Sequence, residues 1–90
     1  MKGIWAAALM PFTEDLVRYI NHSLLQEGDD PIGPDDALID RGLLDSMAVM
    51  MIMTFVEERT GVRVPDKDVT PVNFESVSSI DDMVRRLRGG

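Results

Sequence analysis

A stretch in the middle of the chain, residues 28–45, is unable to form a long helix or a long strand. It is interrupted by five glycines and prolines, which are Gly28, Pro31, Gly33, Pro34 and Gly42. A loop of this length without structure of its own is uncommon in a compact domain, and such loops are usually functional or partly structured. We predict that it is held on the hydrophobic core by Leu38, Ile39, Leu43 and Leu44. The main helices or strands must then come from the segments on either side.

The segment before the loop has the periodicity of an amphipathic helix. Its apolar residues recur at helical spacing at Leu16, Val17, Ile20 and Leu24. Thr13 is a suitable N-cap, and Glu14 and Asp15 follow in the first turn, where the helix dipole favours acids. This pattern predicts a first helix from Thr13 to about Gln26.

The segment after the loop predicts a second helix. It has no glycine or proline between Asp45 and Arg59, and Gly61 is a suitable C-terminal stop. We expect the helix to begin at Asp45 or Ser46 and to end near Arg59. The stripe expected to face the core is Val49, Ile52, Met53 and Val56.

The C-terminal third predicts one short helical turn and a last helix. Residues 62–65 are too short and too limited by proline for a strand, and the turn is expected within residues 68–74. Ser79-Ile80-Asp81-Asp82 matches a variant of the capping box and predicts a helix that continues through Met83, Val84 and Leu87. The expected fold is a small all-α bundle of three main helices, one short turn and a long first loop.

Composition and charge exclude several classes of function. Ninety residues make one small domain, and the absence of cysteine excludes disulfides, thiol catalysis and cysteine zinc sites. The net charge of −7 argues against nucleic acid, whose phosphates require clustered Lys and Arg. Residues 11–45 hold nine acids and only two bases, whereas residues 61–90 balance five acids with five bases. This distribution favours a basic protein partner, attracted in a salt-dependent manner.

Residues 1–11 are interpreted as an N-terminal extension and residues 12–90 as the folded domain. The apolar run from Ile4 to Met10 is too short for a membrane span, which needs about 20 apolar residues. Pro11-Phe12 supplies no cleavage site for a signal peptide. We therefore expect a cytoplasmic protein outside the membrane, with the extension laid on the core; a docking segment is the alternative.

Asp45 and Ser46 stand together at the predicted start of the second helix, within the run Asp40-Arg41-Gly42-Leu43-Leu44-Asp45-Ser46-Met47. Further marks downstream are Val56-Glu57-Glu58-Arg59-Thr60-Gly61-Val62, Val64-Pro65 and Asn73-Phe74-x-Ser76-x-x-Ser79-Ile80. With these marks the chain resembles the phosphopantetheine-dependent carrier proteins over residues 12–88. That family marks its attachment site with a Gly-x-Asp-Ser-[Leu/Met] pattern, and here one extra leucine separates Gly42 from Asp45.

The resemblance implies that Ser46 is the attachment point of a 4′-phosphopantetheine arm that holds an acyl or aminoacyl group as a thioester. A separate phosphopantetheinyl transferase would attach the arm from coenzyme A, with Ser46 as nucleophile and Asp45 near the transferase's Mg²⁺. The position suits a phosphodiester, because a helix N-terminus offers free N–H groups and a positive dipole end. Taken alone, a serine before a helix is far better explained as an N-cap, and the two roles are compatible.

The implied partners are the transferase, an acyl- or aminoacyl-loading ligase, and an acyltransferase or synthase. The pattern looks most like stand-alone carriers of polyketide or nonribosomal-peptide (antibiotic) pathways, and we expect a monomer that is not itself an enzyme and binds no metal of its own. The candidate docking residues are Met47, Met50, Met51 and Thr54 on the second helix and Asp40 and Arg41 before it. Methionine suits a surface that fits several partners. Unlike fatty-acid carriers, this helix has no acid between Met47 and Val56, which argues against purely electrostatic docking.

Other functions find weaker support. Pro31 and Pro34 interrupt the ligand spacing that a calcium loop would need. His22 is the only histidine and has no acid and nucleophile arranged around it, which argues against a Ser-His-Asp hydrolase. The alternative that remains is an unmodified helical interaction module that uses the methionine-rich face as its contact surface.

Overall fold

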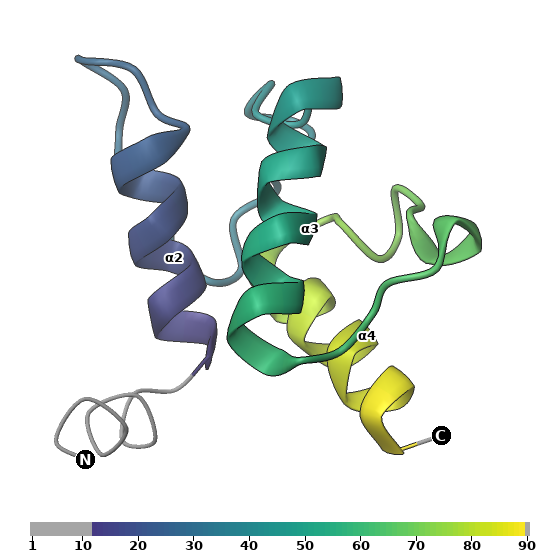
Figure 1. Cartoon of the computed structure of the whole chain (residues 1–90). Helices are drawn as coiled ribbons and strands as arrows, with labels where there is room; N and C mark the ends of the chain where they lie inside the picture. The colour runs from purple at the N-terminus through teal and green to yellow at the C-terminus, as the bar shows by residue number, and fades with distance from the viewer. Residues whose placement is uncertain (1–11, 90) are drawn as a thin grey trace, which may run out of the picture.

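The computed structural model describes residues 12–89, and this part of the chain forms a helical bundle without strands (Figure 1). Its elements in chain order are α2 (Phe12–Ser23), α3 (Ser46–Thr60), the 3₁₀ turn η1 (Asp66–Asp68) and α4 (Val77–Gly89). The predicted all-α bundle of three main helices, one short turn and a long first loop is confirmed. The extension predicted for residues 1–11 lies outside the described residues.

Helices α2 and α3 lie side by side and run in opposite directions (Figure 1). The ring of Tyr19 stacks on that of Phe55 with 4.5 Å between centroids, and Phe12 approaches the same ring at 6.4 Å. Near the end of α3, the Nε of Arg59 donates a hydrogen bond of 2.8 Å to Oδ2 of Asp15. These contacts fix the pairing of the two helices from Phe12 to Tyr19 of α2.

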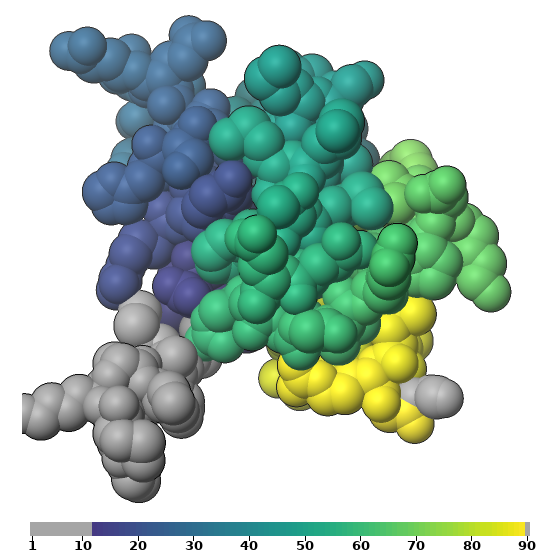
Figure 2. All heavy atoms as spheres, viewed as in Figure 1, coloured from purple at the N-terminus to yellow at the C-terminus, as the bar shows by residue number. Residues whose placement is uncertain are grey.

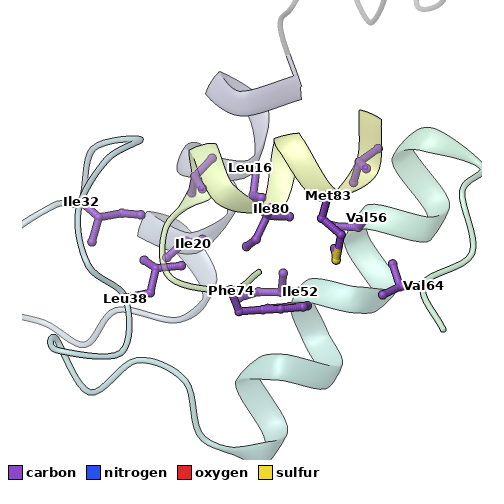
Figure 3. Close-up of a cluster of buried hydrophobic side chains, with 12 residues drawn as sticks. Leu16, Ile20, Ile32, Leu38, Ile52, Val56, Val64, Phe74, Ile80 and Met83 are labelled. Carbon is purple, nitrogen blue, oxygen red and sulfur yellow. The ribbon is translucent and has the colours of Figure 1, made fainter. Parts of the chain in front are cut away.

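The hydrophobic core lies where the three helices, the first loop and the segment before α4 meet (Figure 3). Its buried side chains are Leu16, Ile20, Ile32, Leu38, Ile52, Val56, Val64, Phe74, Val77, Ile80, Met83 and Val84. On α3 the buried stripe is Ala48, Ile52 and Val56. The predicted core positions Val49 and Met53 are only half-buried at its edge, because the centre of the stripe lies one helical position away from them.

Three helix boundaries differ from the sequence-based prediction. Helix α2 begins at Phe12, so Thr13 lies inside its first turn, and it ends at Ser23 rather than Gln26. Helix α4 begins at Val77, two residues before the predicted cap at Ser79. The cap is Ser76, whose Oγ accepts a 3.1 Å hydrogen bond from the N–H of Ser79. The earlier start allows the helix to bury Val77 fully.

The short turn also lies earlier than predicted. It occupies Asp66–Asp68, where residues 68–74 were expected to hold it. The chain then makes a separate hydrogen-bonded turn in which the N–H of Phe74 donates to the carbonyl of Thr70 at 3.1 Å. Pro71 stands inside this second turn, where it lacks the N–H that a continuing helix would need.

The long first loop is tied to two helices. The side chain of Asn21 on α2 accepts from the N–H of Ile32 at 2.8 Å and donates to its carbonyl at 3.3 Å. The N–H of Leu38 donates to the carbonyl of Glu75 at 2.8 Å, just before α4. Leu38 is buried as predicted, but Ile39 is 44% exposed, and Ile32 supplies the second buried anchor in its place. Ile39 instead borders a surface hollow with Pro71 and Val72. The other two predicted anchors, Leu43 and Leu44, are half-buried against the core.

We predict that the core contribution of α3 is concentrated at Ile52, which is fully buried. Ile52→Ala should lower the free energy of unfolding by about 2–5 kcal/mol, because it leaves a cavity among the three helices. Ile52→Val removes one methyl group and should cost about 0.5–1.5 kcal/mol. Urea unfolding followed by circular dichroism measures both.

Met50→Ala is the matched control on the same helix, because Met50 is 68% exposed. It should change the free energy of unfolding by no more than about 0.5 kcal/mol. If Met50→Ala lowers the free energy of unfolding as much as Ile52→Ala does, the assignment of the core face of α3 is wrong.

Candidate functional site

Helix α3 begins with a side-chain cap from Asp45. The carboxylate Oδ1 of Asp45 accepts a 2.8 Å hydrogen bond from the N–H of Ala48, and its backbone is extended, with φ −84° and ψ 177°. The turn that delivers the chain to this cap needs a left-handed residue, and Gly42 supplies it with φ +71°. Asp45 is therefore the cap, and α3 begins at Ser46, one of the two starts that the sequence allowed.

Ser46 is the first residue of α3 and is exposed. Because Asp45 provides the cap, the hydroxyl of Ser46 is not needed to satisfy the helix terminus, and the N-cap interpretation of Ser46 is wrong. The N–H groups of Ser46 and Met47 lie in the first turn, where no carbonyl precedes them in the helix. This end of α3 therefore has a hydroxyl that makes no capping hydrogen bond, free backbone N–H donors and the positive end of the helix dipole.

An open apolar groove of about 530 Å³ starts at Ser46 and runs along α3. Its lining consists of Ser46, Met47, Met50, Met51 and Thr54 from α3 and Tyr19 from α2. The side chains of Met47 and Met50 are 71% and 68% exposed. Both helices reach the surface in the view of Figure 2. Because Tyr19 of α2 is part of the lining, the groove lies on the α2 side of α3. The four candidate docking residues of this helix are thus brought together beside Ser46.

Tyr19 is the groove residue that sequence reasoning missed. It is half-buried on α2, and its ring stacks on Phe55, which holds it against α3. A sequence signal did exist, because Tyr19 lies three residues after Leu16 and next to Ile20, at the edge of the buried stripe. Which helix would cover that edge depended on the pairing of α2 with α3, which periodicity alone does not give.

The other two candidate docking residues, Asp40 and Arg41, do not line this groove. The Arg41 guanidinium donates to the backbone carbonyl of Asp30 and forms an ion pair with Asp36, with Nη1 and Oδ2 3.9 Å apart. Its positive charge is therefore used inside the first loop. Asp40 is exposed and borders a separate hollow with Ile39 and Val72.

A second apolar hollow, of about 310 Å³, lies on the opposite flank of α3. It is lined by Ile39, Leu44, Val49, Val69, Thr70, Pro71 and Phe74. The buried stripe of α3 lies between the groove and this hollow. The exposed face of the helix, which includes Ser46 and Met50, is directed outward.

The alternative chemistries considered from the sequence are not assembled. Within residues 12–89, no three His, Cys, Asp or Glu side chains are grouped in a way that would hold a metal ion. His22 is exposed at the end of α2 and borders another surface hollow, together with Glu14 and Arg18. Among the described helices, none has the length and apolar character that crossing a membrane requires.

Comparison with known proteins identifies one family. Residues 15–87 match the sequence model described as "Phosphopantetheine attachment site". No match is found among curated protein sequences.

Two solved structures contain chains that are similar to this one. The first, described as "Crystal structure of FAD-dependent dehydrogenase", matches with a TM-score of 0.72 and 25% identity, over 79% of this chain and 100% of the other. The second is described as "Crystal structure of Bradyrhizobium japonicum glycine:[carrier protein] ligase complexed with glycylated carrier protein". It matches with a TM-score of 0.63 and 27% identity, over 81% of this chain and 99% of the other.

We predict that the cap is the main contribution of Asp45 to stability. Asp45→Ala should lower the free energy of unfolding by about 1 kcal/mol, because the N–H of Ala48 loses its acceptor. Asp45→Asn keeps an equally good cap and should stay within a few tenths of a kcal/mol of the unsubstituted protein. Thermal and urea unfolding measure both variants.

Asp40→Ala is the control for the loss of one acid from the same loop, since Asp40 is exposed and lies outside the cap. Equal destabilisation by Asp45→Ala and Asp40→Ala would show that charge, and not the cap, determines the effect.

Proposed function

The chain belongs to the phosphopantetheine attachment family, and from this membership we propose that Ser46 carries its 4′-phosphopantetheine arm. The domain is a carrier protein and not an enzyme. We further propose that the arm holds an acyl or aminoacyl intermediate of polyketide or nonribosomal-peptide biosynthesis, in the cytoplasm and on a monomeric protein. The observation that carries the assignment of Ser46 is the Asp45 cap, which leaves the neighbouring hydroxyl free at an exposed helix start.

The residues at the start of α3 fit a phosphodiester. The phosphodiester that would join the arm to Ser46 is an anion. It would lie beside the free N–H groups of Ser46 and Met47, at the positive end of the helix dipole. The carboxylate of Asp45 is also negative, but its Oδ1 is already held by the N–H of Ala48. This leaves Oδ2 available for the Mg²⁺ of a transferase, which prefers carboxylate oxygens.

The attachment step requires only a nucleophile from this chain. Oγ of Ser46 attacks the phosphorus of coenzyme A that bears the pantetheine, a new P–O bond forms, and the pyrophosphate P–O bond breaks. The adenosine bisphosphate leaves, and the serine proton passes to a base. Within residues 12–89 no acid or histidine is hydrogen-bonded to Oγ of Ser46, so we assign this base to the transferase.

The arm, when attached, supplies the thiol on which the cargo is held as a thioester. A cysteine-free chain has no competing thiol of its own. The chain's own contribution is to hold the attachment oxygen at a rigid helix start. From there a flexible arm raises the effective concentration of the cargo at each partner's active site.

We propose that partners dock on the apolar groove formed by Tyr19, Met47, Met50, Met51 and Thr54. The groove supports this because Ser46 lines its end, so an enzyme that reaches the arm covers the groove. Its exposed methionines would become buried on docking, which is favourable at roughly 25 cal/mol per Å² of apolar surface. Asp40 and the other acids of the first loop would attract basic enzymes from a distance.

One of the similar solved structures supports a class of partner. One similar chain belongs to a structure of a glycine:[carrier protein] ligase with a glycylated carrier protein. This favours an aminoacyl-loading ligase among the partners proposed here, ahead of an acyltransferase or a synthase. A small amino acid cargo makes no demand for a large hydrophobic cavity in the carrier.

We predict that incubation with coenzyme A, Mg²⁺ and a broad-specificity phosphopantetheinyl transferase adds one phosphopantetheine mass to the protein. Ser46→Ala should gain no mass, because it lacks the attacking oxygen. Ser23→Ala, at an exposed serine at the end of α2, is the matched control and should be modified like the unsubstituted protein. Intact-protein mass spectrometry measures all three.

Circular dichroism of Ser46→Ala must show the same helical content, so that loss of modification is not loss of fold. If every sample is folded and none gains mass, the proposal is wrong, and an unmodified interaction module is favoured. A mass gain that persists in Ser46→Ala would move the attachment site to another residue.

A further inference from the structure

The methionines of this chain occupy two opposite environments. On α3, Met47 and Met50 are 71% and 68% exposed beside Ser46, whereas Met83 on α4 is 1% exposed in the core. Both exposed side chains line the groove next to the attachment serine. The most exposed methionines among the described residues therefore lie together on the surface that partners would cover.

Accessible thioethers react with peroxides. Hydrogen peroxide transfers one oxygen atom to the sulfur, an S–O bond forms, the O–O bond breaks, and water leaves. The sulfur is oxidised by two electrons and the peroxide is reduced by two, so the step needs no other reactant. The product, methionine sulfoxide, is polar, and methionine sulfoxide reductases reverse it with a thiol as reductant.

The same oxidation has different consequences at the two places. At Met47 and Met50 the added oxygen points into solvent, and the fold loses little because neither side chain is in the core. When a partner covers the groove, that oxygen is buried in an apolar contact without a hydrogen-bond donor, which is unfavourable. At Met83 the oxygen would have to enter the packed core, where burial instead protects the sulfur.

We propose that Met47 and Met50 are oxidation sites through which a peroxide weakens the docking of partner enzymes while the carrier stays folded. This inference rests on the proposed function, because it requires that enzymes acting at Ser46 cover the groove. Met51 is half-buried in the same groove and reacts more slowly. The device is reversible, since the sulfoxide can be reduced in the folded protein.

The first test maps the reaction. The full chain is treated with hydrogen peroxide, desalted and digested with trypsin. The methionines of α3 all fall in the peptide 42–59 and are distinguished by fragmentation, while Met83 falls in the peptide 68–85. We expect sulfoxide at Met47 and Met50 first, with Met83 unmodified at the same exposure. Oxidation of Met83 at an equal rate would overturn the proposal.

The second test asks whether the sulfoxides affect docking. The probe is a broad-specificity phosphopantetheinyl transferase, added after the peroxide has been removed, and the initial rate of mass gain is measured. We expect the oxidised protein to be modified about tenfold more slowly, as a buried polar group without a partner implies. Treatment with methionine sulfoxide reductases and dithiothreitol should restore the rate.

The decisive comparison uses the double variant Met47→Leu/Met50→Leu, which keeps the apolar volume without the sulfur atoms. Each protein is compared with its own untreated sample, so a change in basal rate cancels. The double variant should lose its sensitivity to peroxide, whereas Met53→Leu, at a half-buried position on the other flank of α3, should remain as sensitive as the unsubstituted protein.

Equal sensitivity of the double variant and Met53→Leu would overturn the inference. So would an oxidised protein that unfolds, as judged by circular dichroism, before its rate of modification falls. Neither result bears on the proposed function, which is tested separately by the mass gain of the untreated protein at Ser46.

Discussion

The hydrogen bond from the N–H of Ala48 to the carboxylate of Asp45 determines where α3 begins, and the site depends on that boundary. With Asp45 as the cap, the next residue is already helical, and its side chain is free of the task that a capping serine performs. Had Ser46 been the cap, its hydroxyl would have been turned toward the backbone of its own helix. A single hydrogen bond thus separates a structural serine from an accessible one.

The cap can act in this way only because the loop before it is held at several points. Asn21 binds both backbone groups of Ile32, and Leu38 is buried while its N–H bonds to the carbonyl of Glu75. The loop is long, but these contacts divide it into short spans with little freedom each. In a small chain without cysteine, such contacts replace the cross-links that would otherwise hold a long loop.

The parts of the fold that could be predicted from the sequence are those set by local rules. The C-terminal stop of α3 followed from Gly61, which is left-handed with φ +73°, and the exposed placing of Met47 and Met50 followed from the helical period. The start of α4 was mispredicted because Ser76 and Ser79 both satisfy the local rule for a cap. Burial of Val77 decides between them, and burial is a tertiary property.

The dependence on tertiary contacts also explains which groove residue was missed beside Ser46. The motif that singles out Asp45 and Ser46 is contiguous in the sequence. The groove beside it is built from two helices, and its residue Tyr19 is far from Ser46 in the sequence. Its position depends on the stacking of Tyr19 on Phe55, a contact between helices that no pattern within either helix contains. The placement of Ile39 failed for a similar reason, because the turn orientation at Leu38 is set by the bond to Glu75.

The acids of the first loop and the apolar groove on α3 are separate, and they differ in how much they contribute to the stability of the fold. Several loop acids also hold turns: Asp36 accepts from the N–H of Gly33 at 2.7 Å, and Asp29 accepts from that of Gln26 at 2.8 Å. Asp35 accepts from the hydroxyl of Ser78 on α4. Changing these acids would therefore alter the loop as well as the electrostatic field.

The exposed groove methionines carry no such structural duty, since Met47 and Met50 lie outside the core and the helix keeps its buried stripe without them. In the proposed docking, attraction at long range is thus coupled to the fold, while recognition at contact is not. In the docking proposed above, substitutions on the exposed face of α3 would change the contact with partners at little cost in stability, whereas substitutions of the loop acids would also alter the loop.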